Sequence, residues 1–180
     1  MGGISRLLER LRGPESLRRL ARLMPRLSVL DVGANRGDFY QQTRAAGLVG
    51  PYFAIEPDPV LAAILSEKFS TIDVLSIAIG ETDGQQRLHR YSRPELNSFL
   101  ELTEASLTQY DCVALEPMDV ETWSIETLGQ YVMERCSPAQ PFLLKLDTQG
   151  LDQMILRHLT SPFIERIHAI QTEVAIQSIY

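Results

Sequence analysis

The stretch VLDVGANRGDF at residues 29–39 decides the fold of this chain of 180 residues. An apolar run over residues 29–32 is interrupted by Asp31, and a loop of small residues follows from Gly33 to Gly37. Residues 38–46 then read as the opening of a helix. A strand, a glycine loop and a helix in this order are typical of a site where backbone closely approaches a ligand, because glycine has no Cβ and tolerates positive φ.

The loop differs from the fingerprint of dinucleotide-binding proteins. Its spacing is Gly33-x-x-x-Gly37 after Asp31, whereas the fingerprint has a further glycine that lets a pyrophosphate reach the helix N-terminus. This spacing and the acidic side chain disfavour a nicotinamide-dependent oxidoreductase and favour a ligand with a cationic amine. A simple strand-to-helix turn without a ligand is the alternative for this stretch alone.

A second strand is expected within residues 51–59, and it ends in Glu56. Glu56 lies 23 residues beyond Gly33, close to the position from which an acidic side chain accepts hydrogen bonds from a ribose diol. Pro57 and Pro59 end the strand, and a helix is predicted from Pro59 to Phe69.

The remaining periodicity predicts an α/β fold with an open, mainly parallel sheet that is doubly wound by helices. Further strands are expected at residues 72–80, 141–150 and 167–176, with a helix at 151–159. Four acidic residues fall at or near the ends of the expected strands: Asp31, Glu56, Asp147 and Glu173. Ligands of such sheets lie beyond the carboxyl ends of the strands, so these side chains are expected to converge on one site.

The middle of the chain departs from this repeat. Residues 85–91 alternate weakly, residues 93–102 are polar, and residues 112–123 contain a short strand and the start of a helix that reaches about Arg135. We expect this region to be an insertion near the ligand that determines specificity.

Composition indicates one globular unit with a distinct leader. The chain is 44% apolar and 22% charged and has no apolar run long enough to cross a membrane. Residues 1–26 contain seven arginines and two acidic residues, whereas residues 27–180 contain ten basic and 21 acidic residues. Nucleic acid is therefore an unfavourable partner for the acidic body. Cys112 and Cys136 have neither metal-site nor disulfide spacing, which favours the cytoplasm. Histidines and carboxylates form no cluster with metal-ligand spacing either, so no metal requirement is expected.

The leader contains two expected amphipathic helices, at residues 4–12 and 15–24. They could make a peripheral contact with an anionic membrane through residues 4–24, or pack on the neighbouring sheet.

Three blocks of the sequence resemble the FkbM family of S-adenosylmethionine-dependent methyltransferases. They are VLDVGANRGDF (29–39), FAIEPDP (53–59) and LLKLDTQGLDQMIL (143–156). The resemblance implies a Rossmann-like class I methyltransferase fold for residues 27–180. It also implies transfer of a methyl group from S-adenosylmethionine to a hydroxyl of a small-molecule or glycan acceptor, such as a sugar or natural product.

The resemblance implies a site residue by residue. The methionine end of the cofactor would lie over the first loop, the ribose on Glu56, and the adenine near Pro57. The first loop contributes Asp31, Gly33, Ala34, Asn35 and Gly37, and the adenine would also meet the backbone of Ala78 and Ile79. The candidate catalytic residues on the acceptor side are Asp147, Lys145 and Glu173. Lys145 could equally form a structural ion pair, and His89 and His168 are weaker candidate bases.

Two departures from the family leave alternatives open. The family usually has glutamate at the positions of Gln149 and Asp152, and a glutamine cannot ionise. A catalytically inactive protein that binds the cofactor or acts as a scaffold is therefore an alternative. A full methyltransferase sheet also has two further strands after the fifth, whereas this chain ends at Tyr180. Either the chain is cut short, or the sheet lacks these strands and has an open edge that would favour a homodimer.

Overall fold

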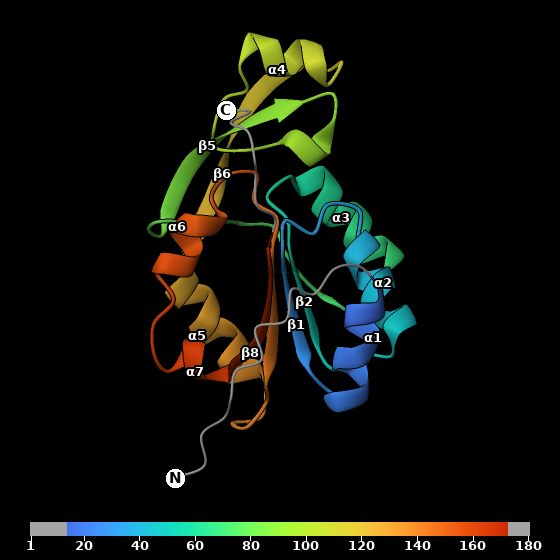
Figure 1. Ribbon diagram of the computed structural model, residues 1–180. Coiled ribbons are helices and arrows are strands. Elements are labelled where there is room, and N and C mark those ends of the chain that lie inside the picture. The colour runs from blue at the N-terminus through green and yellow to red at the C-terminus, as the bar shows by residue number, and fades with distance from the viewer. Residues whose placement is uncertain (1–13, 173–180) are drawn as a thin grey trace.

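A computed structural model describes the chain from residue 14 to residue 172 and contains one five-stranded parallel sheet (Figure 1). In spatial order, its strands are β3 (Asp73–Leu75), β2 (Tyr52–Ile55), β1 (Ser28–Val32), β7 (Phe142–Leu146) and β8 (Ile167–Thr172). From β1, the chain adds β2 and β3 on one side and β7 and β8 on the other. The strand order therefore reverses between β1 and β7, which is where ligands of such sheets bind.

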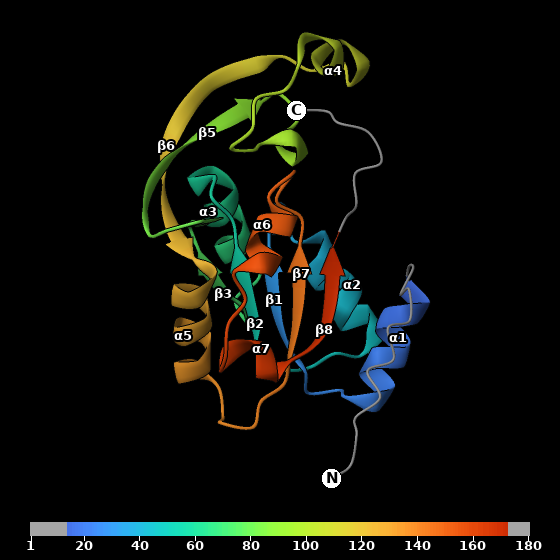
Figure 2. The ribbon, with the colours of Figure 1, turned by 60° about the vertical axis from the view of Figure 1, so that its left-hand side comes forward.

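Helices cover both faces of the sheet, as Figure 2 shows. They are α1 (Pro14–Leu23), α2 (Asp38–Ala46), α3 (Pro59–Lys68), α5 (Ile125–Arg135), α6 (Asp152–Arg157) and α7 (Phe163–Arg166). Successive strand residues point to opposite faces. Val29 of β1 accordingly packs in the core shared with α1 and α2, whereas Leu30 and Val32 pack in the core shared with α5, α6 and α7. These two apolar cores confirm the predicted doubly wound α/β class.

A second, three-stranded sheet rises beyond the carboxyl ends of the first (Figure 1). It consists of β4 (Ala78–Gly80), β6 (Ala114–Ser124) and β5 (Gly84–Tyr91), with β5 and β6 antiparallel. The segment between β5 and β6 contains the 3-10 helix η1 (Pro94–Leu96) and the short helix α4 (Glu104–Gln109). This inserted segment, together with β5 and β6, makes up the insertion that the sequence predicts.

Two predicted elements of this region are corrected. Residues 72–80 are not one strand: β3 pairs with β2, whereas β4 pairs with β6 in the other sheet. Apolar periodicity could not show this, because Ile77, in the link between the two strands, is as buried as Ile79 of β4. The strand expected within residues 112–123 is also longer than predicted, because β6 continues to Ser124 and α5 begins only at Ile125. Ser124 caps this helix: its Oγ accepts a hydrogen bond from the Thr127 N–H at 3.1 Å.

Helix α1 confirms the helix expected at residues 15–24 of the leader. The helix expected at residues 4–12 lies outside the described residues. Leu17, Leu20 and Ala21 of α1 are buried in the same core as Val29 of β1, so the apolar face packs against the fold. Contact with a membrane through the arginine face stays a prediction. Within residues 14–172, each helix is too short or too polar to cross a membrane.

Boundaries near the carboxyl end differ slightly from those expected. Helix α6 is shorter than the predicted 151–159, and strand β8 is described only from Ile167 to Thr172. Glu173, one of the candidate catalytic residues, lies outside the described residues.

Candidate active site

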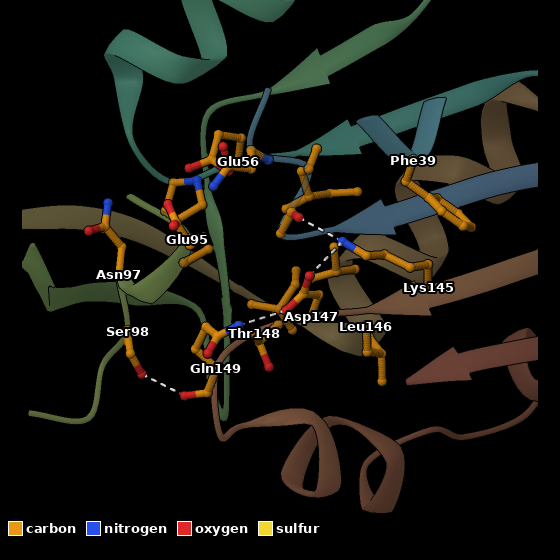
Figure 3. A pocket seen from close by; sticks show the side chains of 18 of the residues that line it. Phe39, Glu56, Glu95, Asn97, Ser98, Lys145, Leu146, Asp147, Thr148 and Gln149 are labelled. Atoms are coloured by element: carbon orange, nitrogen blue, oxygen red, sulfur yellow. Dashed lines mark hydrogen bonds and ion pairs between the residues drawn. The ribbon is translucent and has the colours of Figure 1, made fainter. Parts of the chain in front are cut away.

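A cavity of about 540 Å³ opens at the carboxyl ends of β1, β2 and β7, under the segment that joins β5 to β6 (Figure 3). This volume is within the usual range of small-molecule sites. The β1–α2 loop, the ends of β2 and β4, the β7–α6 turn and η1 all contribute to its wall. The predicted residues that line it are Gly33, Ala34, Asn35, Glu56, Pro57, Ala78, Ile79, Lys145 and Asp147.

The glycine loop contacts the β7–α6 turn directly. Gly33 has a φ of +79°, and a Cβ placed on it would lie 2.1 Å from the backbone O of Asp147. Both the left-handed backbone and the close approach require glycine here. The Asp147 N–H donates to the Val32 carbonyl at 3.0 Å, so two loops from opposite sides of the switch point are joined at the cavity floor.

Glu56 lies at the end of β2 with its carboxylate held by backbone. One oxygen accepts from the Asn35 N–H at 2.8 Å and the other from the Asp58 N–H at 3.0 Å. Burial raises the pKa of Glu56 to about 7, although these two hydrogen bonds favour the ionised form. The side chain therefore changes charge near neutral pH while its position on the cavity wall is fixed.

Lys145 joins the two central strands beneath the cavity. Its Nζ donates to the Gly33 carbonyl at 2.7 Å and lies 2.9 Å from Oδ1 of Asp31 and 3.5 Å from Oδ2 of Asp147. Burial alone would lower the pKa of Lys145, but the two carboxylates outweigh it and raise that pKa, so the ammonium is charged. The structural ion pair that the sequence analysis left open is present.

Two predicted cofactor residues lie behind the cavity wall. Asp31 is fully buried, and the Tyr52 hydroxyl donates to its other oxygen at 2.5 Å. Gly37 precedes α2 with a φ of +82°, and a Cβ there would lie 2.5 Å from the ring of Phe69. Both residues shape the loop, and neither belongs to the cavity lining.

Asp147 is the carboxylate of the β7–α6 turn that faces the cavity, with 31% of its side chain exposed. Its Oδ1 accepts from Nε2 of Gln149 at 2.8 Å (Figure 3). Gln149 has a φ of +52°, and its backbone carbonyl accepts from the Ser98 hydroxyl at 2.7 Å. The inserted segment is thus bonded to the turn that carries Asp147.

Asp152 fixes the other side of this turn. Its Oδ1 accepts from both the N–H and the hydroxyl of Thr148, at 2.9 and 2.5 Å, and its Oδ2 accepts from the hydroxyl of Thr172 at 2.6 Å. The shorter aspartate in place of the family's usual glutamate is therefore fully engaged in holding the turn against the end of β8.

Sequence reasoning did not identify every residue that matters here. Ser98 lies in the polar stretch 93–102, and no local pattern could show that its hydroxyl reaches Gln149. The two candidate histidines lie outside the cavity: His89 contacts the cavity residue Ser98 only through backbone, and the exposed His168 lies at the amino end of β8. Neither lines the cavity.

The cavity has the parts of a Rossmann-like ligand site: a glycine loop, an acidic residue at the end of the next strand, and Lys145 and Asp147 across the switch point. The chain belongs to the FkbM methyltransferase family, since residues 31–178 match the Methyltransferase FkbM domain. A comparison with curated proteins gives no match. The protein is thus a methyltransferase, of a family that generally uses S-adenosylmethionine.

Proposed function

We propose that this protein binds S-adenosylmethionine in the cavity and methylates a hydroxyl of a sugar, glycan or natural product in the cytoplasm. The observation that carries the proposal is that Glu56 and Asp147 line one cavity, on either side of the glycine loop at Gly33. The carboxylate of Glu56 is suited to binding the ribose diol, and that of Asp147 to accepting a proton.

The cofactor end of the cavity fits this ligand. Each oxygen of Glu56 already accepts one backbone N–H, and a carboxylate retains lone pairs for the two ribose hydroxyls. Ala78 and Ile79 supply an apolar edge for the adenine. Asp31 acts indirectly: it holds Lys145, and Lys145 holds the Gly33 carbonyl in the loop that the methionine end would meet.

The chemistry at the acceptor end needs a base in a fixed position. When bound, S-adenosylmethionine supplies an electrophilic methyl group for in-line attack by the acceptor oxygen. Asp147 accepts the proton that the acceptor hydroxyl loses, since its carboxylate is partly exposed to the cavity and oriented by hydrogen bonding. Lys145 is held by one hydrogen bond and two ion pairs, so it positions the loop and Asp147 rather than exchanging protons itself. The enzyme contributes mainly positioning.

The wall opposite the sheet suits a neutral polyhydroxyl acceptor. Asn97, Phe99 and Gln149 line it from the inserted segment and the β7–α6 turn. Amide groups can both donate to and accept from hydroxyls, and an aromatic ring provides an apolar face for a sugar ring.

The test is transfer of a radiolabelled methyl group from S-adenosylmethionine to a panel of neutral sugars, glycosides and polyols. We expect labelling of at least one acceptor, reduced at least about a hundredfold by Asp147→Asn because the base is lost. Gln42→Leu, on the α2 side of the cavity, is the matched control and should retain most of the rate. Cofactor binding without transfer to any acceptor would favour the catalytically inactive alternative.

A further inference from the structure

We propose that Gln149 is the positioning residue of Asp147: its side-chain amide holds the carboxylate in the orientation that the acceptor hydroxyl meets. The catalytic role of this contact rests on the proposed function, in which Asp147 is the base. A glutamine at this position is then compatible with catalysis rather than a sign of its loss.

The first step is the direct contact. Nε2 of Gln149 lies 2.8 Å from Oδ1 of Asp147, and a carboxylate oxygen accepts but cannot donate, so the amide nitrogen must face it. Lys145 approaches the other oxygen, Oδ2, at 3.5 Å. The carboxylate is therefore held at both oxygens, by a neutral donor on one and a cation on the other, while its side chain stays 31% exposed.

The second step is the backbone that aims the amide. Gln149 adopts a left-handed conformation with a φ of +52°, which is unfavourable for a residue with a Cβ and persists only where its surroundings impose it. Ser98, 2% exposed, donates its hydroxyl to the Gln149 carbonyl at 2.7 Å and also accepts from the Leu100 N–H at 3.0 Å. The inserted segment thus fixes the turn that directs Gln149 at Asp147 (Figure 3).

The third step is the kind of group required. A neutral amide donates a hydrogen bond without competing for the proton of the acceptor. A carboxylate at the same distance would repel an ionised Asp147 or share a proton with it. An apolar side chain of the same size would leave Oδ1 without this donor. The site therefore uses the amide for orientation.

The contact can be tested without any acceptor, by two-dimensional ¹⁵N NMR of the side-chain amides of the full chain. The side-chain amide resonance of Gln149 is assigned as the one that disappears in Gln149→Leu. The resonance of Gln42, an exposed glutamine that lines the same cavity, is assigned in the same way with Gln42→Leu and serves as the reference. We expect the Gln149 resonance to lie apart from the reference in the wild-type protein, and Asp147→Asn to move it to the reference position. Ser98→Ala should move it in the same direction, because the turn is released.

A Gln149 resonance that Asp147→Asn leaves in place would overturn the proposal. Calorimetric titration with S-adenosylhomocysteine, run on the same samples, separates this result from failure of the proposed function. If the wild-type protein does not bind S-adenosylhomocysteine, the proposed function is contradicted. The NMR result would still show whether Gln149 contacts Asp147. We expect Gln149→Leu to leave the affinity for S-adenosylhomocysteine within about twofold, because Gln149 lies on the acceptor side.

Discussion

Lys145 and Asp31 face each other in direct register on the neighbouring parallel strands β7 and β1, with Nζ and Oδ1 2.9 Å apart. The carboxylate is fully buried and the lysine side chain is 10% exposed. The pair lies at the point where the strand order reverses, directly beneath the loop at Gly33. It fixes the floor of the cavity from within the core.

Removing one member of this pair should be costly. We expect Lys145→Met to lower the free energy of unfolding by about 3 kcal/mol or more, because a buried carboxylate loses its cation. Denaturation in urea measures the change. The double variant Lys145→Met with Asp31→Asn should be more stable than Lys145→Met alone, since no buried charge is left. A double variant that is less stable than the single one would contradict a structural ion pair.

Glu56 should make stability depend on pH. Its pKa in the folded protein is about 7 and its ordinary value is 4.5, so the folded state binds the proton more tightly than the unfolded state does. The free energy of unfolding should therefore fall by roughly 3 kcal/mol as the pH rises from 4.5 to 7, with little further change above that range. Urea denaturation across this range measures the slope, and Glu56→Gln should flatten it. An equal slope in the variant would exclude Glu56 as the origin.

Gly33 should tolerate no side chain. We expect Gly33→Ala to cost on the order of 4 kcal/mol and to abolish cofactor binding, because the Cβ would meet the backbone of Asp147. Gly47→Ala is the control, since Gly47 also has a positive φ, +98°, but its Cβ would make only an ordinary contact at 3.8 Å. That control should cost about 1–2 kcal/mol. Similar losses at both positions, measured by thermal unfolding, would show that close approach of the two loops is unimportant.

The packing of α1 should contribute to the stability of the whole fold. Leu20 is 8% exposed in the core shared with β1, whereas Leu23, on the same helix, is 72% exposed. We expect Leu20→Ala to lower the free energy of unfolding by about 2–4 kcal/mol and Leu23→Ala to change it by less than about 0.5 kcal/mol. Equal small effects would mean that the leader helix is only loosely attached.

The central strands of the main sheet could be predicted from the sequence because they are short apolar runs with clear ends. The residues of β1, β2 and β7 are buried on both faces, and Pro57 and the glycines of the loops mark where the strands end. The second sheet could not be predicted in the same way. The first half of β5 is exposed, and most of β6 alternates poorly, so their pairing depends on each other and on β4 rather than on local pattern.

The site was predictable to the extent that it follows from strand ends. Glu56 and Asp147 line one cavity as expected, because parallel strands place their carboxyl ends at one edge. The burial of Asp31 beneath Lys145 could not be read from the sequence, since either side chain alone would suit a ligand. The link from Ser98 to Gln149 spans 51 positions and depends on how the insertion folds back over the sheet.

The most direct measurement is calorimetric titration of the protein with S-adenosylhomocysteine, beside Glu56→Ala and the control Glu95→Ala, which alters the same cavity on its other wall. We predict micromolar binding that Glu56→Ala weakens by about tenfold or more, because two hydrogen bonds to the ribose are lost. Glu95→Ala should leave the affinity nearly unchanged. No heat with the wild-type protein, or equal affinity in the wild-type protein and Glu56→Ala, would contradict the assignment of this cavity as the cofactor site.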